Sequence, residues 1–428
     1  MKVAIYTLGC KVNQYETQAM EQLLRQRGHT IVDCNDEADV YVVNSCSVTA
    51  VSDQKSRQTL HKFRREHPNA VTALCGCYPQ THQEDVKKLD VDVLVGTGHR
   101  THFVELLEEA FAKHQRMEDL DSFLDHRDFE VLPAGGMEER TRAMLKIEDG
   151  CVNFCTYCII PYARGPVRSL PIPTAVRQAK ELAEAGYQEI VLTGIEISSW
   201  GQDLKTGESL IDLLEALSAA VPHVRLRLGS LEPRTITEEF CVRGVKLPNL
   251  CPQFHLSMQS GCDATLKRMN RKYDTARFFR SVELLNQYFD RPAVTTDLIT
   301  GFPEETEEEF GETLAFIRKC RFAQMHIFPY SIRPGTPAAK MKQIPKAVKE
   351  ERAHRAAAVA EELRRAYLED CVGKTYPVLF EEPREGWYFG HAPNYTEILV
   401  DGEQLHNQIH NVKITGVHGH ALLGTIEE

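Results

Sequence analysis

The sequence predicts an α/β protein with three parts: an N-terminal doubly wound parallel sheet, a partial, TIM-like (β/α)6 barrel, and a small C-terminal antiparallel β-barrel. Two regions alternate short apolar runs with amphipathic helical stretches, and a third has short alternating runs without helices between them. Hydrophobic residues occupy 42% of the 428 positions and charged residues 26%. This composition excludes a disordered or fibrous protein, and no apolar run approaches the roughly 18–20 residues that a membrane span needs.

The first domain is expected over residues 1–113. Its apolar runs predict strands, and the amphipathic segments 14–26 and 52–66 predict helices that end before Gly28 and Pro68. The predicted strands cover residues 3–8, 30–32, 40–43, 71–74 and 91–95. Such alternation indicates a mostly parallel sheet with helices on both faces. Residues 114–142 are expected to be a linker, because acidic side chains crowd there ahead of the turn-forming stretch 133–136.

The second domain is expected over residues 143–369, where the alternation resumes six times. The predicted strands cover residues 143–147, 189–193, 224–228, 253–258, 293–299 and 323–328. Helices are predicted between them, for example over residues 174–185, 210–220 and 306–321, and a long final helix covers 346–369. Six units suit an open or partial barrel better than the closed eight-unit one.

The third domain is expected over residues 370–428. Short alternating runs occur at residues 376–380, 398–400, 408–414 and 421–426, with Pro and Gly between them. This pattern is typical of a small antiparallel β-barrel.

Three of the 13 cysteines lie close together directly after the first predicted strand of the barrel: Cys151, Cys155 and Cys158. A structural zinc site needs a fourth ligand, and none lies nearby in the sequence. Iron–sulfur clusters are held by thiolates, usually four, so three thiolates leave one iron open to bind another molecule. The carboxyl end of a barrel strand is also where such barrels build active sites. The spacing therefore predicts a catalytic iron–sulfur cluster.

Three cysteines of the first domain also follow predicted strands: Cys10, Cys46 and Cys77. Open α/β sheets build their sites at the carboxyl ends of strands, so these thiols are candidates for a second three-thiolate cluster. Spacing alone leaves the choice open, because Cys34 also ends a short strand, Cys75 lies beside Cys77, and a lone cysteine is more often a small buried hydrophobe. The remaining cysteines have no ligand-like spacing: Cys241, Cys251, Cys262, Cys320 and Cys371.

These motifs resemble a known family. Residues 151–165 resemble the signature of radical S-adenosylmethionine (SAM) enzymes and, more narrowly, of the methylthiotransferases. Residues 7–13, 44–49 and 76–80 resemble the N-terminal cluster motifs of that family, and residues 255–261 and 296–303 resemble further family blocks. The C-terminal module resembles their TRAM domain, an RNA-binding barrel. The resemblance covers essentially the whole chain, in order.

The resemblance implies two [4Fe-4S] clusters and SAM as cofactors. It assigns Cys151, Cys155 and Cys158 to the cluster whose open iron binds the amino and carboxylate groups of SAM, and it assigns Cys10, Cys46 and Cys77 to an auxiliary cluster that holds an exchangeable sulfur. All six cysteines are then catalytic. One SAM methylates the sulfur, and a second SAM, reduced by an electron donor that the sequence does not identify, supplies the 5′-deoxyadenosyl radical that opens an unactivated C–H bond. Cys75 departs from the family motif, where a non-cysteine is expected.

The expected SAM contacts lie in the turns after the barrel strands. Tyr157 is expected near the adenine, Thr193 and Gly194 near the amino group, and Ser230 and Gln259 near the ribose or carboxylate. For each of them, an ordinary turn residue is the alternative interpretation.

Residues 11–17 most resemble the group that methylthiolates C2 of N6-threonylcarbamoyladenosine at position 37 of tRNA, so the tRNA anticodon stem-loop is the expected partner. Glu196 departs from the histidine found in many members of that group. Isopentenyladenosine in tRNA and an aspartate of a ribosomal protein are the alternative substrates. A non-catalytic iron–sulfur RNA-binding protein is the alternative from another class.

The charge pattern bears on RNA binding and location. A net charge of −11 argues weakly against a nucleic-acid partner, so contact must depend on local patches. Two candidate patches are Lys55, Arg57, Lys62, Arg64 and Arg65, and Lys267, Arg268, Arg271, Lys272, Arg277 and Arg280. The C-terminal module is acidic, so aromatic side chains such as Tyr388, Phe389 and Tyr395 are expected to contribute. The N-terminus has no signal-peptide pattern, and we expect a cytoplasmic protein without membrane contact.

Overall fold

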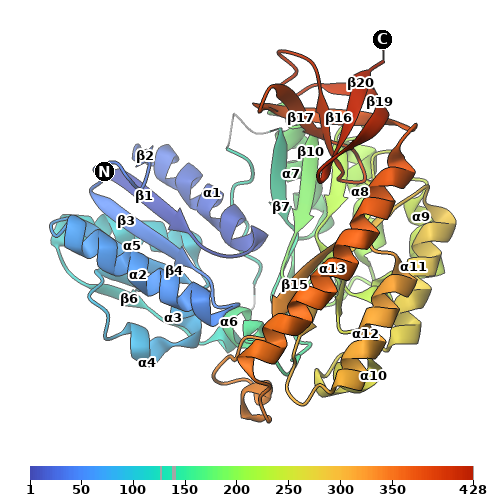
Figure 1. The fold of residues 1–428 in the computed structure, drawn as a ribbon. Helices are drawn as coiled ribbons and strands as arrows, with labels where there is room; N and C mark the ends of the chain where they lie inside the picture. Colours follow the sequence, from blue (N-terminus) through green and yellow to red (C-terminus); the bar gives the residue numbers. More distant parts are fainter. Residues whose placement is uncertain (126–127, 137–140, 428) are drawn as a thin grey trace.

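The computed structural model describes residues 1–125, 128–136 and 141–427. The N-terminal sheet lies beside the barrel, and the C-terminal module sits over one end of the barrel strands (Figure 1). The predicted fold class is confirmed. Among the described residues, every helix is too short or too polar to cross a bilayer.

The N-terminal sheet has six parallel strands in the order β2–β1–β3–β4–β5–β6. In chain order they are β1 (Lys2–Thr7), β2 (Thr30–Val32), β3 (Val40–Ser45), β4 (Val71–Gly76), β5 (Val93–Val95) and β6 (Met117–Asp119). The strand β6 falls inside the segment expected to be a linker. Its three residues pair with β5, and a strand so short has too little periodicity to stand out in an acidic stretch.

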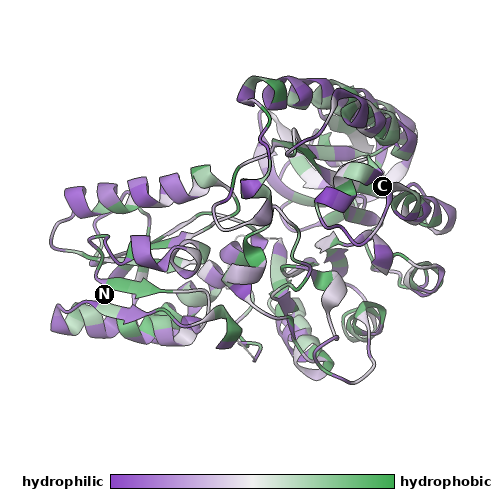
Figure 2. Ribbon diagram, turned by 90° about the horizontal axis from the view of Figure 1, so that it is seen from below, coloured by the Kyte–Doolittle hydropathy of each residue, from purple (hydrophilic) through white to green (hydrophobic). Residues whose placement is uncertain are grey.

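Helices cover both faces of this sheet, because the two middle strands, β3 and β4, are buried on both sides. The helices α1 (Lys11–Gln26) and α5 (Arg100–Lys113) pack on one face, and α2 (Ala50–Glu66), α3 (Cys77–Thr81) and α4 (Gln83–Val86) pack on the other. Figure 2 shows the apolar strands between helices that are banded with polar residues.

The barrel strands are parallel and form two adjoining sheets, β11–β10–β7 and β12–β13–β14–β15. They are β7 (Arg142–Lys146), β10 (Glu189–Thr193), β11 (Arg225–Leu228), β12 (Ser230–Leu231), β13 (Gln253–Gln259), β14 (Ala293–Thr300) and β15 (Gln324–Pro329). A single bridge between Leu226 and Leu250 joins the two sheets. The pairing leaves the barrel open between β7 and β15, and α1 packs against the β7 side through Tyr15, Met144 and Val191.

The outer layer of the barrel is helical (Figure 1). It consists of α7 (Ile172–Glu184), α8 (Leu210–Ala220), α9 (Glu238–Gly244), α10 (Asp263–Arg268), α11 (Thr275–Tyr288), α12 (Glu307–Cys320) and the long α13 (Lys346–Cys371). After β7, two short strands, β8 (Glu148–Asp149) and β9 (Arg168–Ser169), pair in antiparallel fashion. The helix α6 (Ile160–Arg164) lies between them in the chain.

The C-terminal module is a closed five-stranded barrel in the order β16–β17–β18–β20–β19. Its strands are β16 (Thr375–Arg384), β17 (Trp387–His391), β18 (Glu397–Val400), β19 (Ile409–His418) and β20 (Ala421–Ile426). One detail of the prediction is wrong: β18 and β20 pair in parallel, whereas the other four pairs are antiparallel. Closing a barrel with an odd number of strands forces one such pair when the others alternate in direction.

Candidate active site between the N-terminal sheet and the barrel

Cys10, Cys46 and Cys77 follow three neighbouring strands of the N-terminal sheet. Cys10 precedes α1 after β1, Cys46 follows β3, and Cys77 begins α3 after β4. These strands are adjacent and parallel, so their carboxyl ends lie side by side. The structure therefore brings the three cysteines to one edge of the sheet, as the sequence predicted.

Two glycines allow this close approach. Gly9 has a φ of +124°, and a Cβ atom built on it would lie 2.8 Å from the Cβ of Cys46. Gly76 has a φ of +101°, and a Cβ there would lie 2.4 Å from the carbonyl oxygen of Ser45. Both positions combine a left-handed backbone with a lack of space, so only glycine fits them.

The three thiols influence one another. Burial raises the pKa of the Cys77 thiol to about 12, Arg164 opposes the rise, and Cys46 and Cys10 add to it. Burial also raises the pKa of Cys46. Cys75 instead contributes to the apolar core on the α1 side of the sheet, and Cys34 packs against the core on the α2 side. Cys34 and Cys75 therefore have the surroundings of core residues, and the family resemblance assigns neither of them to a cluster.

Cys151, Cys155 and Cys158 lie in the loop between β8 and α6, and residues 268–271 hold this loop in place. The backbone N–H of Thr156 donates to the carbonyl of Met269 at 3.0 Å, and Asn270 donates to the carbonyl of Phe154 at 2.9 Å. The Nη1 of Arg271 lies 3.1 Å from the Sγ of Cys155. Burial raises the pKa of Cys158 to about 12, and burial together with the neighbouring thiols also raises that of Cys151.

The residues expected to contact SAM lie in the cysteine loop and at the ends of barrel strands, but not all of them contact one another. Tyr157 is part of the cysteine loop, and its hydroxyl lies 3.5 Å from the Nη1 of Arg271. Thr193 ends β10 and Gly194 follows it, where a Cβ would meet the carbonyl oxygen of Glu148 at 2.8 Å. Ser230 begins β12, and Gln259 ends β13 with a φ of +65°. Within the described part of the chain, no hydrogen bond joins Ser230 or Gln259 to the other three residues.

A buried ion network connects the two cysteine groups, and sequence analysis did not identify it. Glu16 on α1 pairs with Arg100 of the N-terminal domain at 3.3 Å, and with Lys146 of the barrel at 3.5 Å. Glu16 also accepts hydrogen bonds from Arg164, which in turn lies 3.4 Å from Asp149. Burial alone would raise the pKa of Glu16, but the three cations together lower it to about 2.

Arg333 forms a second buried link between the barrel and the N-terminal domain. Its Nη2 donates to Asp53 at 2.7 Å, and Asp53 also accepts from Ser47, which follows Cys46. The Nε and Nη1 of Arg333 are buried without a hydrogen-bond partner. Arg164 belongs to the stretch 151–165 that resembles the radical SAM signature, whereas Arg333 lies in the loop after β15, far in the chain from the cysteine motifs, and no sequence signal marked it.

These surroundings fit iron–sulfur clusters. Each group offers three soft thiol donors, and buried guanidinium groups nearby compensate the negative charge that thiolate-held clusters carry. Nowhere in residues 1–125, 128–136 or 141–427 are three His, Cys, Asp or Glu side chains placed to hold a single metal ion.

The two basic patches are largely used within the protein. On α2, Arg57 donates to Tyr78 and Arg64 pairs with Asp92 at 2.8 Å. In the second patch, Arg268 pairs with Glu309, and Arg277 donates to the carbonyls of Arg234 and Ile236. Sequence charge alone therefore overstated the cations that these patches offer to RNA.

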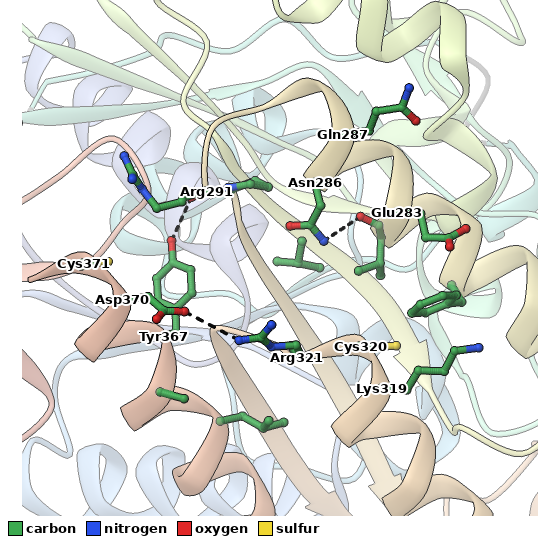
Figure 3. A pocket seen from close by; sticks show the side chains of 16 residues that line it. Glu283, Asn286, Gln287, Arg291, Lys319, Cys320, Arg321, Tyr367, Asp370 and Cys371 are labelled. Carbon is green, nitrogen blue, oxygen red and sulfur yellow. Dashed lines mark hydrogen bonds and ion pairs between the residues drawn. The ribbon is translucent and has the colours of Figure 1, made fainter. Parts of the chain in front are cut away.

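A cavity of about 480 Å³ lies on the outer face of the barrel, between α11, α12 and α13. Figure 3 shows Arg321 reaching Asp370, and Tyr367 bonding to Arg291, across it. Cys320 and Cys371 line this cavity. None of the six motif cysteines lines it, so it is separate from the candidate site.

Comparison with known proteins assigns the chain to a family. Residues 2–96 match the family model UPF0004, an uncharacterized protein family, and residues 145–317 match the radical SAM superfamily. The threonylcarbamoyladenosine tRNA methylthiotransferase MtaB of Bacillus subtilis is 39% identical over 96% of this chain and 93% of its own length. The MtaB protein of Thermotoga maritima is 36% identical over 96% of this chain and 94% of its own length. A tRNA-2-methylthio-N(6)-dimethylallyladenosine synthase of Symbiobacterium thermophilum is 32% identical over the whole chain and 94% of its own length.

Among solved structures, the fold is similar to that of the radical SAM methyltransferase TsrM from Kitasatospora setae, with a TM-score of 0.60 at 13% identity, covering 79% of this chain and 77% of TsrM. That likeness concerns the fold alone. The sequence matches to the two MtaB proteins run at 36–39% identity over 96% of the chain and include both cysteine-bearing regions. The chain belongs to the radical SAM methylthiotransferase family.

Proposed function

We propose that this protein methylthiolates C2 of N6-threonylcarbamoyladenosine at position 37 of tRNA, yielding the 2-methylthio derivative. As a radical SAM tRNA methylthiotransferase, it uses SAM and [4Fe-4S] clusters. The observation that carries the proposal is the position of two three-cysteine groups on either side of one domain interface, because thiolation requires a sulfur source and a radical source near the same carbon. The substrate part is supported by the relatives of 36–39% identity, which are named for threonylcarbamoyladenosine.

The clusters and SAM supply the radical and the sulfur when bound. We assign Cys151, Cys155 and Cys158 to the cluster that binds SAM, and Cys10, Cys46 and Cys77 to the auxiliary cluster. Three thiolates per cluster leave one coordination position free for SAM or for a sulfur ligand.

The protein's own residues hold these two groups in a fixed relation. Residues 268–271 hold the SAM-side loop through several hydrogen bonds, which reach Thr156, Phe154 and Cys155. The network around Glu16 joins α1, which begins one residue after Cys10, to β7 and α6, which flank Cys151–Cys158 in the chain. A rigid interface of this kind keeps the reacting atoms at a constant separation.

One specific observation favours a second substrate, since relatives of about 32% identity are named for dimethylallyladenosine. The test is the modified-nucleoside profile of tRNA from a strain that lacks the gene, with and without a plasmid copy. Loss of 2-methylthio-N6-threonylcarbamoyladenosine, restored by the plasmid, is the expected result. Loss of the isopentenyl nucleoside instead would reassign the substrate, and an unchanged profile would reject both.

A further inference from the structure

A cavity of about 660 Å³ opens where α1, the barrel and the C-terminal module meet. Lys11 and Gln14 of α1 line one side, and Met144 and Val191 of the barrel strands form an apolar part of the wall. The C-terminal module adds Tyr388, Tyr395, His406 and two carboxylates, Glu381 and Glu382, of which Glu382 pairs with Arg384 at 3.5 Å. Lys11 directly follows Cys10 in the chain, so this cavity reaches to within one residue of the proposed auxiliary cluster.

Two arginines of the cavity wall already have anionic partners. Arg142 lies 3.1 Å from Glu381 and donates to the hydroxyl of Tyr395 at 3.0 Å. Arg227 donates to both carboxylate oxygens of Glu189, at 2.7 and 2.8 Å. These contacts fix the walls of the cavity and leave its shape well defined.

Lys11 differs from both arginines. Its ammonium makes no hydrogen bond or ion pair with any residue that the structure describes. The charges that influence the pKa of Lys11 most are those of Arg227 and Arg142, which lower it, followed by Glu189, which raises it. The charge of Lys11 in turn helps to lower the pKa of His326, on the strand at the opposite edge of the open barrel. An unpaired cation that is influenced most strongly by two other cations favours an anion in the same cavity.

The N6 substituents of the two candidate substrates differ in charge. A threonylcarbamoyl group ends in a carboxylate and carries a hydroxyl, whereas an isopentenyl group is uncharged and apolar. A cavity with a free ammonium group, fixed arginines and a tyrosine hydroxyl matches the first group, and a site for the second would need an apolar wall throughout.

We propose that Lys11 binds the carboxylate of the threonylcarbamoyl group in this cavity and thereby selects that nucleoside over uncharged N6 substituents. This inference rests on the proposed function and names a specificity-determining residue for it. A tRNA phosphate is the other anion that Lys11 can meet, and the experiment separates the two sources.

The experiment measures how tightly the reconstituted enzyme binds three anticodon stem-loop RNAs that differ only at position 37. That position carries threonylcarbamoyladenosine, isopentenyladenosine or adenosine. Lys11→Met is expected to weaken binding of the first RNA about 10- to 100-fold, the range for losing one charge-assisted hydrogen bond. The other two RNAs should bind as they do to the wild type. Lys11→Arg should restore most of the loss, and Lys180→Met, which removes an exposed lysine from α7, should change nothing.

A change on the RNA side keeps the test valid even if Lys11→Met disturbs the neighbouring Cys10. An RNA in which the threonyl carboxylate is replaced by a neutral amide should bind wild-type enzyme as weakly as the parent RNA binds Lys11→Met. An equal loss for all three RNAs would identify a phosphate contact and overturn the inference, as would full affinity for the amide RNA. If wild-type enzyme methylthiolates the threonylcarbamoyl RNA but Lys11→Met binds it normally, the inference alone fails. If the wild type does not modify that RNA at all, the proposed function fails.

Discussion

Replacing Glu16 with glutamine should destabilise the protein strongly, because this carboxylate is the centre of the buried network between the two domains. Its side chain is 1% exposed and faces Arg100, Lys146 and Arg164, all of which are at most 4% exposed. Glu16→Gln keeps the shape but leaves these three cations with less compensating charge. Removing one partner of a buried ion pair costs about 3–5 kcal/mol.

A matched control exists on the surface of α7. Glu181 pairs with Arg177 at 2.8 Å, closer than Glu16 lies to Arg100 or Lys146, but both side chains are 57% exposed. Exposed pairs one helical turn apart contribute only about 0.3–0.5 kcal/mol. The same change, Glu181→Gln, should therefore lower the free energy of unfolding by roughly that amount.

The assay is urea-induced unfolding of both variants and the wild type, followed by circular dichroism at pH 7. The account predicts a difference of about 3 kcal/mol or more between the two variants. If Glu16→Gln loses no more free energy of unfolding than Glu181→Gln, the network does not hold the interface together and the reasoning is refuted.

Three further predictions follow from the same geometry. Gly76→Ala should lose about half of the bound iron, because the new Cβ would meet the carbonyl of Ser45. Gly186 also has a positive φ but has open space around it, so Gly186→Ala should keep its iron. Equal iron contents in the two variants would contradict this prediction. Arg271→Met should lower the reduction potential of the SAM-side cluster by removing a donor and a positive charge from Cys155, and an unchanged potential in an EPR-monitored redox titration would count against it. The carboxyl groups of Glu16 and Glu189 have pKa values lowered to about 2, below their ordinary value. The contribution of these two groups to the free energy of unfolding should therefore be constant above about pH 5 and fall as the pH drops from there toward 2. Urea unfolding between pH 3 and pH 7 measures that slope, and Glu16→Gln should flatten it.

Much of the fold was predictable because its elements are long and periodic. The helix predicted over residues 210–220 and the strand predicted over 189–193 have the same limits in the structure. The strands β6 and β17 were missed, since the first has three residues and the second follows a tight turn within an acidic, glycine-containing stretch. Short strands gain their stability from pairing partners that the local sequence does not reveal.

The cysteine motifs were predictable from their positions after strands, because chain direction alone brings the carboxyl ends of parallel strands to one edge. The supporting residues were not. Glu16 and Arg164 lie 148 positions apart in the sequence, and neither looks different from an exposed charged residue until the domains pack together. The role proposed for Lys11 likewise depends on Arg142 and Arg227, which come close to it only in the folded chain and could not be identified from the sequence.

The proposed function requires two separate three-thiolate centres. The measurement that tests it is the iron and sulfide content, with EPR spectra, of anaerobically reconstituted wild-type protein and two triple variants. One carries alanine at Cys10, Cys46 and Cys77, and the other at Cys151, Cys155 and Cys158. We predict about eight irons in the wild type and about four in each variant, with distinct spectra from the two remaining clusters. A wild type with only about four irons, unaffected by loss of the three N-terminal thiols, would contradict the account.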